Sequence, residues 1–329
     1  MYDVIGDIHG QLEKLQGLFQ ALGYTKHGPA YRAPLGRRAV FLGDLIDRGA
    51  GQLGVLEIVR AMVDSGDALC IAGNHEFNAV GFATRSPNEG GQFLRSRSTK
   101  NTKQHAAFLL AVTQDSPEHL AWVNWFKTLP LSLDLKGIRV VHGDWDDAQV
   151  TAVNSVLWEP NSATRTWSDA FVHGSYVEDS ELMRARKLLT CGMELDLPEG
   201  GYIEDKEGHK HYEVRIARWR DWATRLHEVA LVPHDQRQRV PDLALEGLVE
   251  LSGPTGSPIF IGHHWFKGQP LIESPKLACL DWSAATDGPL VAYRWDGETE
   301  LRNEKLVWFG GNDFTVAAAT QGSSGRPGP

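Results

Sequence analysis

The chain of 329 residues contains few cysteines, and their number and spacing argue against both disulfide bonds and cysteine-bound metal ions as stabilising elements. The three cysteines, Cys70, Cys191 and Cys279, are odd in number and far apart in the sequence. Neither a disulfide framework nor a cysteine-ligated zinc site can be assembled from them. We therefore expect a reducing compartment and predict a cytoplasmic location.

The sequence also lacks long apolar segments and an excess of positive charge. No apolar run approaches the length needed to span a bilayer, and the N-terminus shows no signal-peptide pattern. The net charge of −9 disfavours binding to anionic membranes and a role as a nucleic-acid scaffold. With 42% hydrophobic and 23% charged residues, the composition is that of an ordinary globular protein.

What the sequence does contain is a series of short apolar segments that each end in polar residues. The first segment stops at Gly6, and Asp7 and His9 follow it, two residues apart. Alternation along an extended chain directs both side chains to the same side. A carboxylate and an imidazole at the end of a strand are well suited to binding a divalent metal ion.

The same pattern occurs four more times along the chain. The further clusters are Asp44 with Asp47 and Arg48, Asn74 with His75, then His142, and then His263. Helical patterns at 11–22 and 53–62 alternate with the first strands, which predicts an α/β fold with a largely parallel beginning. Because open α/β sheets place ligands beyond the carboxyl ends of their strands, we expect these clusters to form one site.

Together the clusters offer oxygen and imidazole donors but no thiolate, a combination that suits manganese, iron or zinc. Six ligands would be too many for one catalytic ion, but they would suit two ions that share a carboxylate. Two-metal sites commonly hold a phosphoryl group and generate hydroxide near neutral pH.

The ordered motifs G-D-I-H-G, G-D-L-I-D-R-G, G-N-H-E, V-H-G and I-G-H resemble those of the calcineurin-like metallophosphoesterase superfamily. The resemblance covers residues 1–145 and 255–295. It implies a mixed α/β fold, a four-layer α/β/β/α sandwich with a helical cap insertion. It also implies hydrolysis of phosphate esters by a hydroxide that bridges two divalent ions. Manganese is the expected metal, with iron, zinc or nickel as alternatives.

The resemblance assigns a role to each polar residue. One ion would be held by Asp7, His9 and Asp44. Asp44 would bridge to a second ion, whose other ligands would be Asn74, His142 and His263. The catalytic group would consist of His75 as general acid, Asp47 orienting it, and Arg48 binding phosphate oxygens, with Asn74 and His75 also contacting the substrate. These roles are physically reasonable, since a guanidinium binds phosphate bidentately and a protonated histidine can supply a proton to a leaving oxygen.

Two branches of the superfamily remain as alternatives. The G-N-H-E motif and the Asp47–Arg48 pair resemble the serine/threonine phosphoprotein phosphatases, whereas segments 122–130 and 261–295 resemble the bacterial symmetrical diadenosine tetraphosphate hydrolases. The expected partner is therefore a small phosphorylated substrate, a nucleotide or a phosphoprotein, and the oligomeric state is left open. Outside the enzymes, the alternative is a degenerate phosphate-binding regulatory module.

We predict a catalytic domain over residues 1–313, with 158–251 inserted as a cap and 314–329 as a disordered tail. Helical patterns in the cap fall at 177–189 and 216–232, and its tryptophans are expected to be mostly buried. The spacing in 276–295 predicts an antiparallel meander.

Four further expectations concern residues around the predicted site. The basic segment 85–103 is expected to be a solvated loop. Arg215 and Arg218 are candidates for a second phosphate-binding arginine, and His264 is expected to support the site or to pack beside it.

Overall fold

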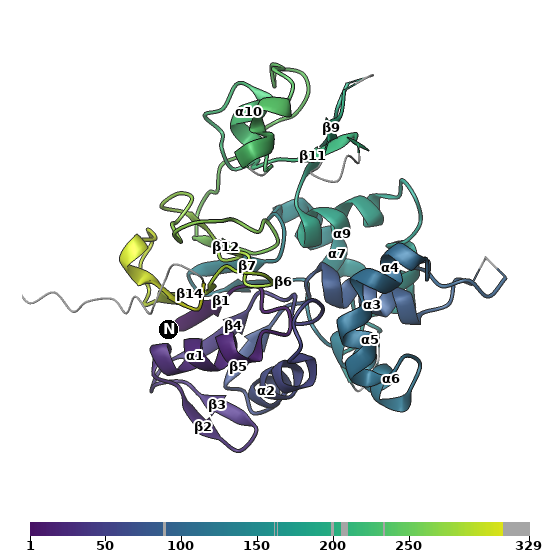
Figure 1. The fold of residues 1–329 in the computed structure, drawn as a ribbon, viewed down its shortest axis with the longest axis vertical. Coiled ribbons are helices and arrows are strands. Elements are labelled where there is room, and N and C mark those ends of the chain that lie inside the picture. Colours follow the sequence, from purple (N-terminus) through teal and green to yellow (C-terminus); the bar gives the residue numbers. More distant parts are fainter. Residues whose placement is uncertain are drawn as a thin grey trace, which may run out of the picture.

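The computed structural model of the chain describes residues 1–311 except 88–89, 161, 163, 199–200, 205–209 and 233. Two β-sheets lie at its centre with helices packed around them (Figure 1). The predicted disordered tail at 314–329 lies outside the described residues. Within the described part of the chain, no helix is both long and apolar enough to cross a membrane.

The first sheet has five strands in the order β15-β14-β1-β4-β5. Their bounds are Leu306–Phe309, Leu290–Trp295, Tyr2–Ile5, Arg38–Phe41 and Ala68–Cys70. Strands β1, β4 and β5 run parallel to one another, which confirms the predicted parallel beginning. Strand β14 is antiparallel to both of its neighbours, β1 and β15.

The second sheet has four strands in the order β13-β12-β7-β6. Their bounds are Leu277–Cys279, Ile259–Ile261, Ile138–Val141 and Ser132–Leu135. Strands β13, β12 and β7 are parallel, and β6 forms the predicted hairpin with β7. A separate small hairpin, β2 (Thr25–His27) with β3 (Ala30–Arg32), follows the first helix.

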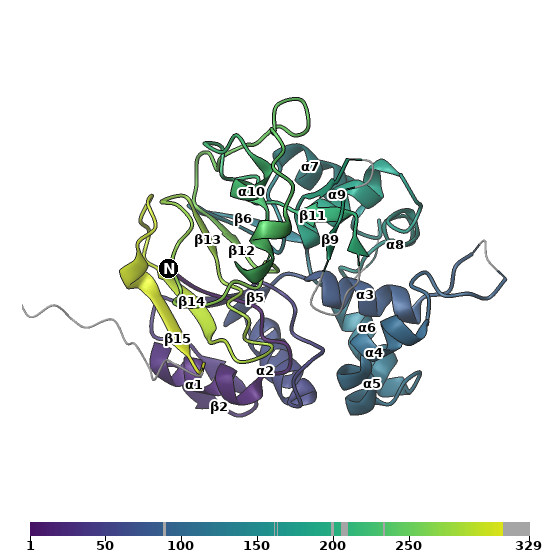
Figure 2. The ribbon, with the colours of Figure 1, turned by 45° about the horizontal axis from the view of Figure 1, so that its top comes forward.

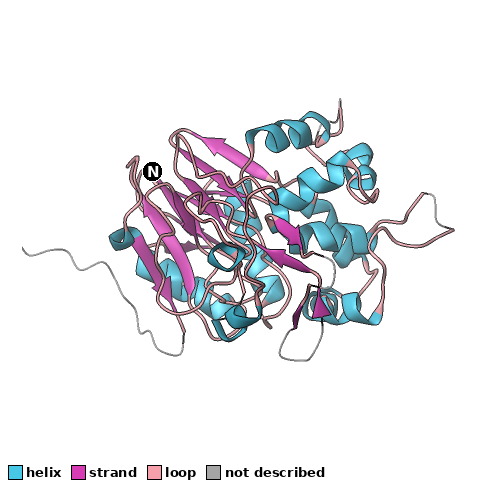
Figure 3. Ribbon diagram, turned by 90° about the horizontal axis from the view of Figure 1, so that it is seen from above, coloured by secondary structure: helices cyan, strands magenta, loops and turns pink. Residues whose placement is uncertain are grey.

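Alternating side chains hold the two sheets face to face and the helices against their outer faces. Val4 of β1 and Val140 of β7 lie in one apolar cluster that both sheets share. Ile5 and Ile261 instead join the cluster formed with the helices, because successive residues of a strand face opposite ways. Figure 3 shows the strands grouped together, with many helices to one side. The predicted α/β/β/α sandwich is therefore confirmed.

Helices α1 (Leu12–Leu22) and α2 (Gln52–Asp64) pack beside the first sheet, as their apolar periodicity predicts. A second group of helices lies together on one side of the molecule (Figure 2). It comprises α3 (Asn74–Ala83), α4 (Thr99–Gln104), α5 (Ala106–Val112) and α6 (Pro117–Phe126). Helix α4 was not predicted, and it makes the basic segment more ordered than a plain loop.

The remaining helices are α7 (Asp147–Val156), α8 (Asp169–Gly174), α9 (Glu181–Cys191) and α10 (Leu226–Val229), with short 3-10 turns at His234–Arg239 and Asn303–Lys305. Helix α9 confirms the predicted helix near 177–189, shifted toward its C-terminal end. Val153 of α7 and Leu189 of α9 join the large apolar cluster around the outer faces of the sheets.

The predicted helix over 216–232 is wrong, because only α10 is helical there. The chain instead folds back on itself, with Ile216 bridging to Ala230 and the Ala217 N–H donating to the Val229 carbonyl at 2.8 Å. Buried side chains from this stretch form a small apolar cluster of their own. Their burial in this cluster accounts for the apolar spacing from which the helix was predicted. Trp222 is also an exception to the predicted burial of the cap tryptophans, since 67% of it is exposed.

Around this cluster lie short strand pairs and a turn of helix (Figure 1). Strand β8 (Glu194–Asp196) pairs with β11 (Glu213–Arg215), and β9 (Ile203–Glu204) pairs with β10 (Lys210–His211).

The predicted meander over 276–295 is also wrong. Strands β13 and β14 belong to different sheets, and β13 runs parallel to β12. Each is a buried apolar segment, and such a segment identifies a strand without specifying which of two stacked sheets takes it.

Candidate metal centre

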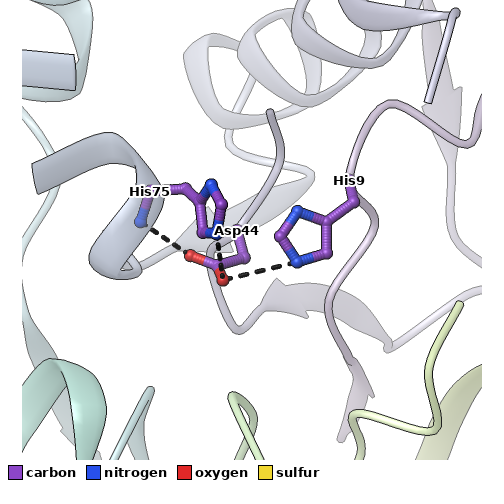
Figure 4. A group of neighbouring side chains, drawn as sticks. All are labelled: His9, Asp44 and His75. Atoms are coloured by element: carbon purple, nitrogen blue, oxygen red, sulfur yellow. Dashed lines mark hydrogen bonds and ion pairs between the residues drawn. The ribbon is translucent and has the colours of Figure 1, made fainter. Parts of the chain in front are cut away.

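The structure brings the five predicted polar clusters together beyond the carboxyl ends of β1, β4, β5, β7 and β12. Asp44, from the loop after β4, lies at the middle. Its Oδ2 atom is 3.5 Å from His9 Nε2 and 3.3 Å from His142 Nε2. The same oxygen is 3.8 Å from His75 Nε2. Figure 4 shows His75 and His9 on either side of this carboxylate.

Two groups of potential ligands share Asp44. One consists of His9, Asp44 and His75, and the other of Asp44, His142 and His263. Within each group the ligand atoms all lie within 4.8 Å of one another. A ligand that bridges two ions must be shared by both groups in this way, as the Asp44 carboxylate is.

Asp7 and Asn74 complete the predicted ligand set. The Asp7 side chain is buried, its Oδ2 accepts a hydrogen bond from the His263 N–H at 3.0 Å, and it lies 3.9 Å from His142 Nε2. The Asn74 Oδ1 atom is 2.8 Å from His263 Nδ1 and 3.2 Å from His142 Nε2. All six predicted ligands therefore converge.

Two of the histidines are held in a fixed orientation by main-chain carbonyls. His9 Nδ1 lies 2.8 Å from the Ile46 carbonyl, and His142 Nδ1 lies 2.7 Å from the Leu42 carbonyl. Donation from Nδ1 to these oxygens leaves Nε2 facing Asp44 in both residues. Metal-binding histidines are commonly oriented in this way.

The residues present fit divalent ions. Asp7 Oδ1 and His263 Nε2 are buried, and neither has a hydrogen-bond partner among the described residues. Burial, reinforced by the nearby His75, lowers the pKa of His9 to about 4. Burial and Arg215 likewise lower the pKa of His263. Both imidazoles are then neutral, which is the form that binds metal.

Backbone strain is concentrated at this centre. His9, Asp44, Asp47, Arg48 and His263 all have positive φ angles, between 48° and 72°. Such conformations cost on the order of 1–3 kcal/mol each and persist where surrounding contacts enforce them. The loops are therefore shaped for the site rather than for local stability.

Glycines in the motifs let the loops approach one another closely. A Cβ atom on Gly73 would lie 2.2 Å from Asp44 Oδ1, and one on Gly262 would lie 2.2 Å from Asp7 Oδ1. Any side chain at either position would displace a carboxylate of the centre.

The predicted acid and its partner are in contact. His75 Nδ1 is 2.5 Å from Asp47 Oδ2. Burial lowers the pKa of His75, but Asp44 and Asp47 outweigh it, so the pKa is raised overall. A histidine that binds a metal ion commonly makes the same kind of hydrogen bond to a carboxylate. The metal content of a His75 variant therefore decides whether His75 is a general acid or a metal ligand.

Three supporting residues were missed at the sequence level. Glu76 is fully buried and accepts hydrogen bonds from the N–H groups of Asp44, Leu45 and Gly73, at 2.8 to 2.9 Å. Gln52 accepts from the Asp47 N–H at 2.8 Å. For Glu76 a signal existed, because a glutamate early in a helix often reaches back to its start.

His105 is the third, and it is bound to Asp47 from the opposite side to His75. His105 Nδ1 is 2.8 Å from Asp47 Oδ1, and the imidazole is buried between Phe82 and Phe108. Asp47 therefore accepts from two histidines, one on each oxygen. No motif marks His105, since it lies 58 residues away in the sequence.

A cavity of about 500 Å³ opens above the centre. Arg48 is exposed in it, and three cations from outside the motifs also line it, Arg95, Arg215 and Lys267. Arg218, the other candidate, instead contacts Asp146 at 3.4 Å away from this cavity. His264 is buried beside Trp219, with ring centroids 5.1 Å apart.

The chain is similar in sequence to several known proteins. The chain is 31% identical over 139 residues to a bis(5'-nucleosyl)-tetraphosphatase (asymmetrical) of Oceanobacillus iheyensis, covering 42% of this chain and 53% of that one. The corresponding protein of Halalkalibacterium halodurans is 42% identical over 74 residues, 22% of this chain and 30% of that one. The match thus spans about half or less of these relatives' own length.

Solved structures with a similar course of the chain include a cold-active protein-tyrosine phosphatase of Shewanella (TM-score 0.46, 14% identity, 93% of this chain and 76% of that one). A serine/threonine phosphatase of Saccharomyces cerevisiae has a TM-score of 0.39 and 16% identity, over 96% of this chain and 82% of that one. The family model described as calcineurin-like phosphoesterase matches residues 2–198, more than half of the chain. The chain therefore belongs to the calcineurin-like phosphoesterase family.

Proposed function

We propose that this protein hydrolyses phosphate esters or phosphoanhydrides with two divalent metal ions bound around Asp44. The observation that carries the proposal is the position of this carboxylate, which lies within 4 Å of imidazoles from both ligand groups. Asp7, His9 and Asp44 would hold one ion. Asp44 would be shared with the second ion, together with Asn74, His142 and His263.

The donor set suits manganese, with iron, zinc or nickel as alternatives. When bound, two such ions polarise phosphoryl oxygens and lower the pKa of water. No cysteine takes part in the proposed set, which therefore does not depend on the redox state of a thiol.

The chain's own residues would position the phosphoryl group and the proton. Arg48, which is exposed in the cavity and has no ion-pair partner among the described residues, would bind phosphoryl oxygens with its planar fork. Arg215 is proposed as a second such group. His75, kept protonated by Asp44 and Asp47, would give its Nε2 proton to the leaving oxygen. Asn74 would contact the substrate beside it.

For the substrate we propose dinucleoside tetraphosphates and related nucleotides first, because the similar curated proteins are named bis(5'-nucleosyl)-tetraphosphatases. Phosphoproteins are the second candidate, favoured by the G-N-H-E motif and the Asp47–Arg48 pair. The insertion at 158–251 is proposed as a cap, since its Arg215 lines the cavity. A cytoplasmic location stays a prediction, which the three free cysteines support.

The experiment is a substrate panel on protein that has been freed of metal and reloaded with Mn²⁺. It includes p-nitrophenyl phosphate, a phosphopeptide, diadenosine tetraphosphate, mononucleotides and 2′,3′-cyclic nucleotides. We expect metal-dependent hydrolysis of p-nitrophenyl phosphate and faster hydrolysis of diadenosine tetraphosphate.

The products then separate two modes of cleavage. Symmetrical cleavage of diadenosine tetraphosphate gives two ADP molecules, whereas asymmetrical cleavage gives ATP and AMP. If the loaded protein hydrolysed nothing in the panel, the proposed activity would be wrong and a phosphate-binding regulatory module would replace it.

A further inference from the structure

One cation of the cavity wall, Arg95, is held in an unusual way. Its Nη1 donates to Asn78 Oδ1 at 2.7 Å, and its Nη2 donates to Gln104 Oε1 at 3.0 Å. Both acceptors are neutral. Among the described residues, no carboxylate lies within 4.0 Å of its guanidinium.

Arg97, two residues later, shows what a neutralised arginine of this segment looks like. Both of its terminal nitrogens donate to the Asp115 carboxylate at 2.7 Å. Its guanidinium also packs on the rings of Phe82 and Phe93. Arg97 does not line the cavity, whereas Arg95 does. The same basic segment therefore places one paired arginine away from the cavity and one arginine without a carboxylate inside it.

The state of Arg95 is costly unless an anion is nearby. The side chain is half-buried, and burial lowers the pKa of its guanidinium, although it remains charged at any ordinary pH. A partly desolvated charge is stabilised by a counter-charge, and neutral amide oxygens supply only part of that stabilisation. These two amide oxygens do, however, fix the orientation of the Arg95 guanidinium.

The contact with Asn78 also places Arg95 relative to the proposed acid. Asn78 lies three residues after His75 on α3, so the two side chains project from the same side of the helix, one turn apart. Arg95 also lines the same cavity as His75 and Asp47. An anion at Arg95 would thus sit beside the phosphoryl group that Arg48 and His75 address.

We propose that Arg95, oriented by Asn78 and Gln104, binds a second phosphate of the substrate, linked to the one that is cleaved. The inference rests on the proposed function and sharpens its substrate class to compounds with two or more linked phosphates. Arg95 is then a specificity-determining residue, whereas Arg48 binds the phosphoryl group of every substrate.

The test compares inorganic phosphate with inorganic tripolyphosphate as inhibitors of p-nitrophenyl phosphate hydrolysis, at constant free Mn²⁺. Arg95→Ala should weaken inhibition by tripolyphosphate about tenfold, the scale of one charge-assisted hydrogen bond. Inhibition by phosphate should change less than twofold. Gln104→Ala should weaken tripolyphosphate inhibition by a smaller factor, because it removes only one of the two groups that orient the fork.

Arg97→Gln is the matched control, since it removes a guanidinium from the same segment outside the cavity. It should leave both inhibition constants unchanged. Removal of metal by tripolyphosphate would affect all variants alike, so it cannot produce the difference. Thermal unfolding of each variant shows whether the segment is still folded.

Two results would overturn the proposal. Equal weakening of phosphate and tripolyphosphate by Arg95→Ala would mean that Arg95 binds the cleaved group, and unchanged tripolyphosphate inhibition would mean that it binds no substrate anion. Calorimetric titration of the same anions into Mn²⁺-loaded protein needs no turnover. It therefore tests Arg95 even if the wild-type protein hydrolyses nothing, and the two failures can be told apart.

Discussion

The floor and the wall of the cavity are built differently. The floor consists of the proposed metal ligands with His75 and Asp47, on strained loops that are fixed from behind by Glu76 and Gln52. The wall consists of Arg95, Arg215 and Lys267, which come from three separate segments outside the motifs. Floor side chains are mostly buried, whereas those of the wall are half-buried or exposed.

This contrast suggests a division of labour. Residues held by several buried contacts can keep the geometry that bond cleavage requires. Residues on the rim can determine which substrates bind without disturbing that geometry. Variants of the floor should therefore lower activity on all substrates, whereas variants of the wall should separate one substrate from another. The following experiments test this contrast, from the largest expected effect to the smallest.

Asp44→Asn should cause the greatest loss, on the order of 10⁴-fold in kcat, because it removes the charge that both ligand groups share. The loss should be similar on p-nitrophenyl phosphate and on diadenosine tetraphosphate. Asp144→Asn is a matched control, because Asp144 is also a buried carboxylate but belongs to neither ligand group, and an asparagine oxygen can still accept the hydrogen bond from the Met193 N–H. Nearly full activity of Asp44→Asn would contradict the shared role.

His75→Ala should lower kcat by ~10²–10⁴-fold on an alkyl phosphate, the usual worth of general acid catalysis. On p-nitrophenyl phosphate the loss should be much smaller, because that leaving group hardly needs a proton. Asp47→Asn should show the same split more weakly. Metal analysis is run in parallel: equal losses on both substrates, or a missing ion, would make His75 a ligand or a structural residue.

Arg48→Ala should raise KM and weaken inhibition by inorganic phosphate about tenfold, since the fork supplies charge-assisted hydrogen bonds to the anion. Arg60→Ala, in α2, removes a partly buried arginine that pairs with Asp64 and packs on Trp122 outside the cavity, and it should change neither value. If phosphate inhibition were unchanged in Arg48→Ala, a different group would bind the anion.

His105→Ala should lower kcat on an alkyl phosphate about tenfold, because Asp47 loses the partner that fixes its second oxygen. The loss on p-nitrophenyl phosphate should be smaller, as for His75. His119→Ala is the matched control: His119 is buried and packs on the same Phe108 ring, and no contact joins it to Asp47 among the described residues. Equal losses in the two variants would mean that His105 only packs in the core and does not orient Asp47.

The floor could be predicted from the sequence because its parts are local. Asp7 and His9, for example, directly follow a strand, and the parallel arrangement of strands brings such loops to one edge. The strands themselves were recognisable as short apolar segments between turns, and α1 and α2 as periodic ones.

Apart from Arg215, which was a candidate, the wall and the supporting residue His105 could not be predicted, because their side chains reach the site through contacts that no short pattern specifies. His105 meets Asp47 across 58 residues, and Arg95 depends on Asn78 and Gln104 from two different helices. In the region of Ile216, apolar spacing indicated a helix, but the same residues pair with a distant segment and form a small cluster. Local propensity was overridden there by tertiary contacts.

The proposed activity depends most on two ions acting together at Asp44. The most direct measurement is a titration of metal-free protein with Mn²⁺ in which bound metal and hydrolysis of p-nitrophenyl phosphate are followed together. We predict that full activity requires two bound ions per chain. Full activity after one ion, or in metal-free protein, would contradict it.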